Sequence, residues 1–270
     1  MRIQRLLPAA PALFGAAWMP AAALAGAFMQ PAGHGQAIIT ARFETSDTYL
    51  DSSGLARPVR DYRKFELQSW LEYGWNDAVT LIFAPSASQI STSLQANPLR
   101  RETKVSDTYT RVEAGARFRI HQSSIGAVAF QATAAVTEKL ASANQFGIRY
   151  DRNELDLRLL FGRNFSFGTW SGYLDLQGGY RLRAGAPNEW RGDITNGMHI
   201  LPQWLLLVQN FNLIAHKDAH KPGKRSHKAQ VSLVYKLTGQ WSLQAGSFTT
   251  FSARNARRDH GWLLAIWRGF

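Results

Sequence analysis

The chain has 270 residues, a formal net charge of +12, no cysteine and 12% aromatic residues, including nine Trp. The absence of cysteine excludes a disulfide-stapled scaffold, so stability has to come from the fold itself. The length suits one large domain or two ordinary ones.

The first 25 residues are expected to be a secretory signal peptide. Arg2 and Arg5 form a basic start, an apolar run follows through Leu24, and Ala23-Leu24-Ala25 is a small-x-small cleavage site before Gly26. The alternative is an uncleaved membrane anchor, but three prolines interrupt the run and would break a spanning helix. Export argues against a nucleic-acid partner for this basic chain, and residues 26–36 are interpreted as a periplasmic lead-in.

From residue 37 onwards, apolar and polar side chains alternate with a period of two, for example in "YTRVEAGARFRI" and "NELDLRLLFG". This period indicates β-strands with one apolar face. Half-buried sheets of soluble proteins alternate in the same way, but their strands are usually about five or six residues long. The expected strands are 37–50, 61–75, 77–90, 106–120, 124–138, 146–163, 167–183, 188–199, 203–216, 226–237, 240–253 and 260–270.

The connections fall into two sets. Alternate connections are tight turns such as "WND" and "HQSS", and most of the others are longer and rich in basic residues, Gly, Pro and Ser. This organisation is typical of outer-membrane barrels. The predicted fold is therefore all-β, a closed antiparallel transmembrane β-barrel of about twelve strands over residues 37–270, with ten or fourteen as the margin. Aromatic residues near the strand ends are expected at headgroup level: Trp70, Tyr73, Trp75, Phe165, Trp170, Trp204, Trp241 and Trp262.

The alternation places ten basic and eight acidic side chains inside the barrel. Ten of these are candidates for binding a solute: Arg111, Glu113, Arg117, Arg119, Glu154, Asp156, Arg158, Asp175, Arg181 and Arg183. The others are Arg42, Glu44, Lys64, Glu66, Glu72, Arg191, Asp193 and Lys228. Two interpretations stay open: a permeation path for an anionic or hydroxyl-rich solute, or charges that pair across strands and fill the barrel.

Basic residues also cluster in the long loops. Lys217, Lys221, Lys224 and Arg225 suit a polyanion, either an acidic polysaccharide or the phosphates of lipopolysaccharide. The same region contains His216 and the Ser226-His227 pair, a candidate outer-rim hydrolase site with Asn210, Asn212 or Asp218 as the orienting group. No catalytic site, metal site or cofactor is assigned, because such loops offer these residues by chance and their lysines repel a cation.

The C-terminal stretch "WLLAIWRGF" is similar to the assembly signal of Gram-negative outer-membrane barrels, which ends on Phe, here Phe270. Arg268 departs from that pattern. The resemblance implies insertion by the barrel-assembly machinery. The stretch "GAFMQPAGHGQAIITARFE" resembles the XagA-like outer-membrane proteins of exopolysaccharide systems, which implies a role in biofilm polysaccharide export.

Three functions follow as expectations. The first is passage or export of a saccharide or anionic solute. The second is a closed structural or adhesive barrel with basic surface loops, and the third is an outer-membrane lipid hydrolase. The expected partners are outer-membrane lipid, lipopolysaccharide and a polysaccharide, and the sequence indicates no oligomeric state.

Overall fold

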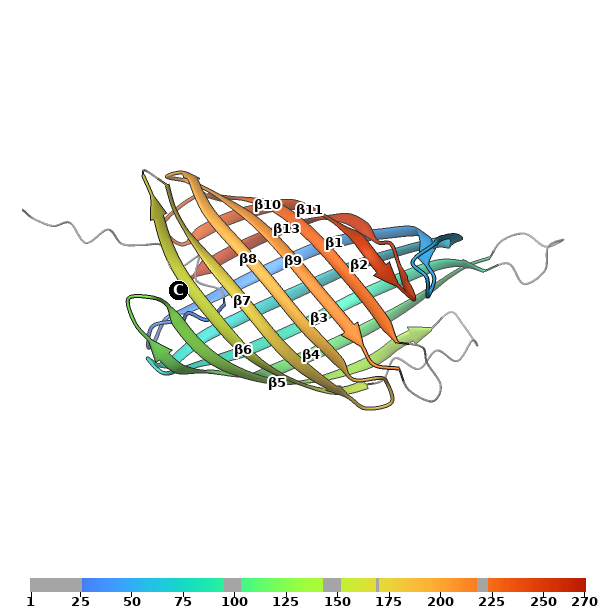
Figure 1. Ribbon diagram of the computed structural model, residues 1–270, viewed down its shortest axis with the longest axis horizontal. Coiled ribbons are helices and arrows are strands. Elements are labelled where there is room, and N and C mark those ends of the chain that lie inside the picture. Colours follow the sequence, from blue (N-terminus) through green and yellow to red (C-terminus); the bar gives the residue numbers. More distant parts are fainter. Residues whose placement is uncertain (1–25, 95–102, 143–151, 169, 218–222) are drawn as a thin grey trace, which may run out of the picture.

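The computed structural model describes residues 26–94, 103–142, 152–168, 170–217 and 223–270. These residues form one closed antiparallel β-barrel (Figure 1). Its strands are β1 (Gly35–Leu50), β2 (Ala56–Asn76), β3 (Val79–Leu94), β4 (Thr103–Gln122), β5 (Ala127–Ser142), β6 (Arg152–Phe167), β7 (Trp170–Arg183), β8 (Glu189–Leu201), β9 (Trp204–Ala215), β10 (Lys224–Lys236), β11 (Trp241–Arg254), β12 (Ala256–Arg257) and β13 (His260–Gly269).

The barrel has twelve strands, because β12 and β13 pair one after the other with β1 and together make the last one. β1 also pairs with β2, so no strand edge is left open to lipid. The expected number is confirmed. The first strand begins at Gly35, two residues closer to the N-terminus than expected.

The C-terminal residue completes the closure. The Gly35 N–H donates to the Phe270 carbonyl at 2.7 Å, and the Phe270 N–H donates back to the Gly35 carbonyl at 3.0 Å. Trp267, three residues earlier and on the inner face, is buried and donates from Nε1 to Gln244 at 3.0 Å. The aromatic C-terminus is therefore part of the last barrel strand.

The two ends of the barrel differ in the length of their connections. Both termini of the barrel and the tight turns, such as Asn76–Val79 and Leu201–Trp204, lie at one end, and the longer connections lie at the other. In an outer-membrane barrel the short turns face the periplasm. We therefore call these ends the periplasmic and the extracellular end.

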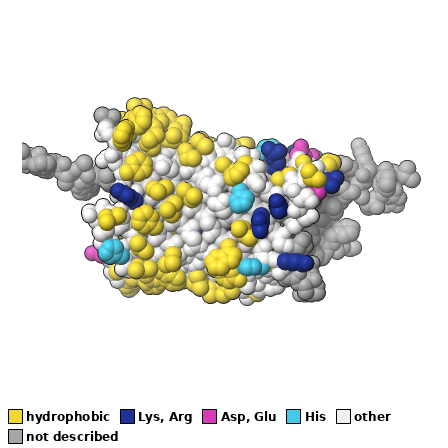
Figure 2. Space-filling model, in the orientation of Figure 1, with side chains coloured by type: hydrophobic (Ala, Val, Ile, Leu, Met, Phe, Trp, Pro, Cys, Tyr) yellow, Lys and Arg dark blue, Asp and Glu magenta, His cyan; other side chains and the backbone are white. Residues whose placement is uncertain are grey.

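Outward-facing positions are apolar and exposed, as a lipid-facing wall requires. Phe65, Leu67, Leu159 and Leu264 are examples. Hydrophobic side chains cover much of the wall in Figure 2, and Lys and Arg gather towards the extracellular end. Among the described residues, no helix is long and apolar enough to cross a membrane.

The structure assigns a face of the wall to two sites that the sequence pattern placed wrongly or left open. Trp70 was expected at the membrane rim, but it lies on the inner face and donates from Nε1 to Glu72 at 3.0 Å, because it shares the parity of Glu72. Pattern alone assigns no face to Leu205-Leu206-Leu207. In the barrel Leu205 and Leu207 are buried inside.

Candidate functional site: the barrel lumen

The residues before β1 lie inside the barrel. The Ala27 N–H donates to Asp175 Oδ2 of β7 at 2.8 Å, and the Gln30 N–H donates to Thr80 Oγ1 of β3 at 3.0 Å. Ala32 then forms a bridge with Gly74 of β2. We call residues Gly26–His34 the N-terminal plug. The expectation of a periplasmic lead-in over 26–36 therefore differs from the structure, which places its first part within the periplasmic half of the lumen.

Apolar contacts seat the plug from two sides. Ala27 and Met29 are buried with Ala127, Ala129 and Leu160 of β5 and β6. Phe28 packs against both this cluster and a second one on the opposite wall. The second cluster consists of Tyr173, Leu205, Leu207, Val234, Ala265 and Trp267. The periplasmic half of the lumen is thus a packed core with Phe28 near its middle.

A buried ion pair joins the plug to the wall. Arg117 Nη2 lies 2.7 Å from Glu72 Oε1, and the two side chains are 2% and 1% exposed. Arg117 Nη1 donates to the Phe28 carbonyl at 3.1 Å, and Gln30 Nε2 donates to Glu72 Oε2 at 3.0 Å. Because each charge also holds a plug group, the pair and the plug stabilise one another.

The plug crosses β2 where the wall has no side chain. The Gly33 N–H donates to the Gly74 carbonyl at 2.9 Å, and the Gly74 N–H donates to the His34 carbonyl at 2.9 Å. A Cβ added to Gly74 would overlap the carbonyl of Pro31. Only glycine allows this close approach of two backbones.

Gly74→Val should therefore displace the plug. We expect chymotrypsin to cut after Phe28 about tenfold faster in the folded variant, because cleavage follows the population of the displaced state. Gly178→Val is the matched control, since a Cβ at Gly178 meets nothing within 4 Å. Equal cleavage of both variants would contradict this seating.

Charged side chains fill the extracellular half of the lumen over β4, β6, β7 and β8. Asp156 lies 2.7 Å from Arg158, 2.8 Å from Arg181 and 3.3 Å from Arg191. Glu154 binds Arg111 at 3.1 Å and Arg183 at 3.2 Å. Three further contacts complete this charged vestibule: Glu189 with Arg183 at 2.7 Å, Asp193 with Arg158 at 2.6 Å, and Glu113 with Arg111 at 2.6 Å.

A second group of charges lies on the opposite wall. Lys228 of β10 contacts Glu44 of β1 at 3.2 Å and Asp259 at 3.8 Å, and Lys64 pairs with Glu66. All of these side chains are only partly buried. These charged groups therefore keep some contact with solvent.

The ten candidate solute residues divide between the two halves. Seven belong to the charged vestibule: Arg111, Glu113, Glu154, Asp156, Arg158, Arg181 and Arg183. Arg117 and Asp175 hold the plug. Arg119 is exposed near the periplasmic turn, just before an irregularity in the β4–β5 register, and belongs to neither group.

Sequence reasoning missed the plug residues Phe28, Met29 and Gln30. Their signal is an apolar and amide-bearing stretch directly after the expected leader, where an exposed linker would be more polar. It also missed the amides Gln131 and Gln177, which bind Arg117 and Arg158. These side chains have the parity of the lumen and carry no charge.

The loop cations are at the extracellular rim. Lys217, Lys224 and Arg225 are exposed, and Lys221 lies outside the described residues. Arg225 stands directly opposite Arg254 of β11, so two like charges face one another.

The candidate hydrolase residues are not assembled into a site. Lys228 points into the lumen towards Glu44, so alternation places Ser226 on the inside and His227 on the outside. His227 Nδ1 lies 2.7 Å from Asn212 Oδ1, and the His216 ring packs near Tyr180. Asp218 lies outside the described residues. Among the residues that are described, no three His, Asp or Glu side chains are grouped to hold a metal ion.

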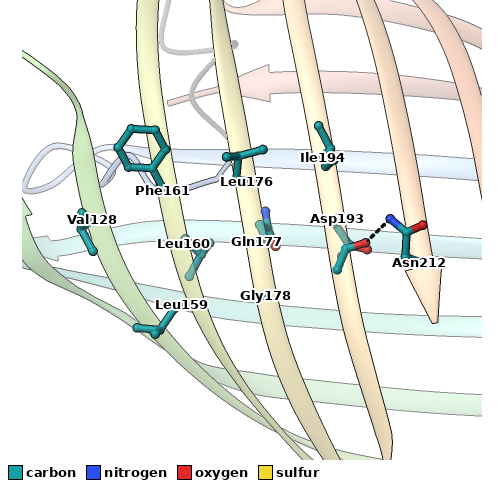
Figure 3. A pocket seen from close by; sticks show the side chains of 11 residues that line it. Val128, Leu159, Leu160, Phe161, Leu176, Gln177, Gly178, Asp193, Ile194 and Asn212 are labelled. Carbon is teal, nitrogen blue, oxygen red and sulfur yellow. Dashed lines mark hydrogen bonds between the residues drawn. The ribbon is translucent and has the colours of Figure 1, made fainter. Parts of the chain in front are cut away.

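The barrel wall carries a shallow groove of about 430 Å³, lined by outward-facing side chains such as Leu159 and also by the lumen residues Gln177 and Asp193 (Figure 3). It lies where Gly178 of β7 pairs with Gly192 of β8, and Leu159, Leu176 and Ile194 surround it. Asn212 borders it and donates from Nδ2 to the Gly192 carbonyl at 2.9 Å.

Solved structures share this architecture. The COG4313 outer membrane channel from Pseudomonas putida F1 matches with a TM-score of 0.65 and 15% identity, over 90% of this chain and 97% of that chain. The translocator domain of autotransporter NalP from Neisseria meningitidis matches with a TM-score of 0.55 and 10% identity, over 88% and 89% of the two chains. The protein is an outer-membrane β-barrel.

The β-domain of the Bordetella autotransporter BrkA is also similar, with a TM-score of 0.52, 11% identity and coverage of 89% of this chain and 100% of that chain. No family model and no curated protein matches the sequence. These likenesses therefore show the fold of the barrel, and fold alone does not give its function.

Proposed function

We propose that this outer-membrane barrel is a gated channel for a hydroxyl-rich or anionic saccharide. The observation that carries the proposal is the division of its lumen. The extracellular half offers guanidinium, carboxylate and amide groups, which bind hydroxyl and acidic groups of sugars. The periplasmic half contains the plug. The plug is joined covalently to the wall only through Gly35, so its withdrawal would leave the barrel strands in place.

The vestibule residues most exposed to solvent are proposed as the solute contacts. Arg111 is 23% and Arg191 24% exposed, while Arg158 is 11% exposed and held by two carboxylates. The counted charges of the vestibule balance, with five arginines and five carboxylates. A passing carboxylate would therefore compete for arginines that already have partners, which favours weak and reversible binding.

The finer proposal is export of an exopolysaccharide. The stretch that resembles XagA-like proteins is the plug together with the start of β1, so the resemblance covers the part of the chain that would move. The alternative of a closed structural barrel requires that the plug never leaves.

Current blockades in planar bilayers test the solute proposal. In the form that lacks Ala27–His34, acidic oligosaccharide added on the extracellular side should interrupt the current, and Arg111→Gln with Arg191→Gln should weaken this blockade about tenfold. Neutral oligosaccharide should be affected much less. Arg63→Gln is the matched control, because Arg63 is 71% exposed on the outer face. An equal loss in both variants, or no blockade, would contradict the proposal.

We also propose that the rim cations bind lipopolysaccharide phosphates. Alternation places Arg225 and Arg254 on the outer side of β10 and β11, at the extracellular end. A phosphate between them would offset the repulsion of the two opposed guanidinium groups.

A further inference from the structure

Asp175 is a buried carboxylate without an ionic partner in the described part of the chain. The residue is 1% exposed, and among the described residues its oxygens accept only the Ala27 N–H at 2.8 Å and the Gln177 amide at 2.7 Å. Eight other lumen carboxylates each contact an Arg or Lys: Glu44, Glu66, Glu72, Glu113, Glu154, Asp156, Glu189 and Asp193. A buried charge without a counter-ion is costly, so the Asp175 carboxyl is either protonated or paired with a cation.

Gly26 lies directly against this carboxylate. A Cβ added to Gly26 would overlap Oδ2 and Cγ of Asp175. The backbone of Gly26 therefore lies against the Asp175 carboxylate, with no room for a side chain between them.

Gly26 is also the residue that follows the expected leader cleavage site. Hydrolysis by a leader peptidase adds water across the Ala25–Gly26 peptide bond, leaving a carboxylate on Ala25 and a new amino group on Gly26. An α-amino group has a pKa of about 7.7–8, so it is mostly protonated at neutral pH. Cleavage therefore creates a cation at the position where the lumen lacks one.

We propose that the α-ammonium of Gly26, created by removal of residues 1–25, forms a buried ion pair with Asp175 that locks the plug in the lumen. The plug is then held at both ends, by this pair at Gly26 and by its continuation into β1 at Gly35. Plug insertion is coupled to maturation, because the uncleaved chain has an uncharged amide at Gly26. The inference deepens the proposed gate but does not depend on transport.

The reactivity of the α-amine tests the ion pair. Protein expressed with its own leader is purified from the outer membrane, its N-terminus is identified by mass spectrometry, and it is acylated with an amine-reactive acetate ester near pH 7.5. The Gly26 amine should react at least about tenfold more slowly in the folded barrel than after unfolding, with the exposed Lys217 as internal reference.

Asp175→Asn should bring the amine to within about twofold of its unfolded reactivity. Glu113→Gln is the matched control, because it removes a lumen carboxylate that contacts Arg111 and Thr133 and lies outside the Asp175 contacts. If Asp175→Asn does not assemble, Gly26→Ala serves instead, since it keeps the ammonium and overlaps Asp175. A mature N-terminus elsewhere, a fast-reacting wild-type amine, or unchanged protection in both test variants would overturn the inference.

Conductance separates this inference from the proposed function. A protected amine in a protein that conducts in no form, even without its plug, would uphold the ion pair and reject the channel. A conducting plugless form together with a freely reactive wild-type amine would do the reverse.

Discussion

Arg117→Met is expected to destabilise the folded barrel by about 3–5 kcal/mol, because it leaves Glu72 as an uncompensated charge in a sealed interior. Glu72 is 1% exposed and keeps only the hydrogen bonds from Gln30 and Trp70 after the substitution. The Phe28 carbonyl and Gln131 lose their donor as well. Urea unfolding in lipid vesicles measures the change in the free energy of unfolding.

Two further variants make this result specific. Arg119→Met removes the same side chain two residues further along β4, where it is exposed, and should change the free energy of unfolding by less than about 0.5 kcal/mol. Arg117→Met combined with Glu72→Met removes both charges and should recover much of the loss. Similar losses for Arg117→Met and Arg119→Met would mean that the buried pair does not stabilise the barrel.

The architecture could be predicted because the alternation reports which side chains face lipid. Val112, Ala114 and Phe118 alternate with Arg111, Glu113 and Arg117, and the structure places the first set outside and the charged set inside. The pattern fails where both faces carry the same residue type, as at Leu205–Leu207, or where a lumen residue is aromatic, as at Trp70.

The site itself could be predicted only in part. Alternation gives the face of Arg158, but its contact with Asp193, 35 residues away, depends on the register of three strands. The plug has no period, since it forms neither strand nor helix over most of its length. Its position depends on contacts with distant partners such as Thr80 and Asp175, which local sequence does not encode.

Deletion of Ala27–His34 is expected to open the lumen without unfolding the barrel. The wall closes through pairs between strands, including the Gly35–Phe270 hydrogen bonds, and none of these involves the deleted residues. The deletion removes Phe28 and Met29 from the periplasmic core and leaves a passage lined by Thr80, Arg117 and Asp175. Strands of this number enclose more space than an eight-stranded barrel, whose side chains fill it.

Single-channel recording of the mature protein and of the form without Ala27–His34, at equal protein concentration in planar bilayers, tests the central claim most directly. If the plug closes a polar channel, the shortened form should show a mean conductance at least about tenfold higher than the mature protein, which should open only rarely. Equal conductance of the two forms, whether both are open or both are closed, would show that the N-terminal plug is not the gate.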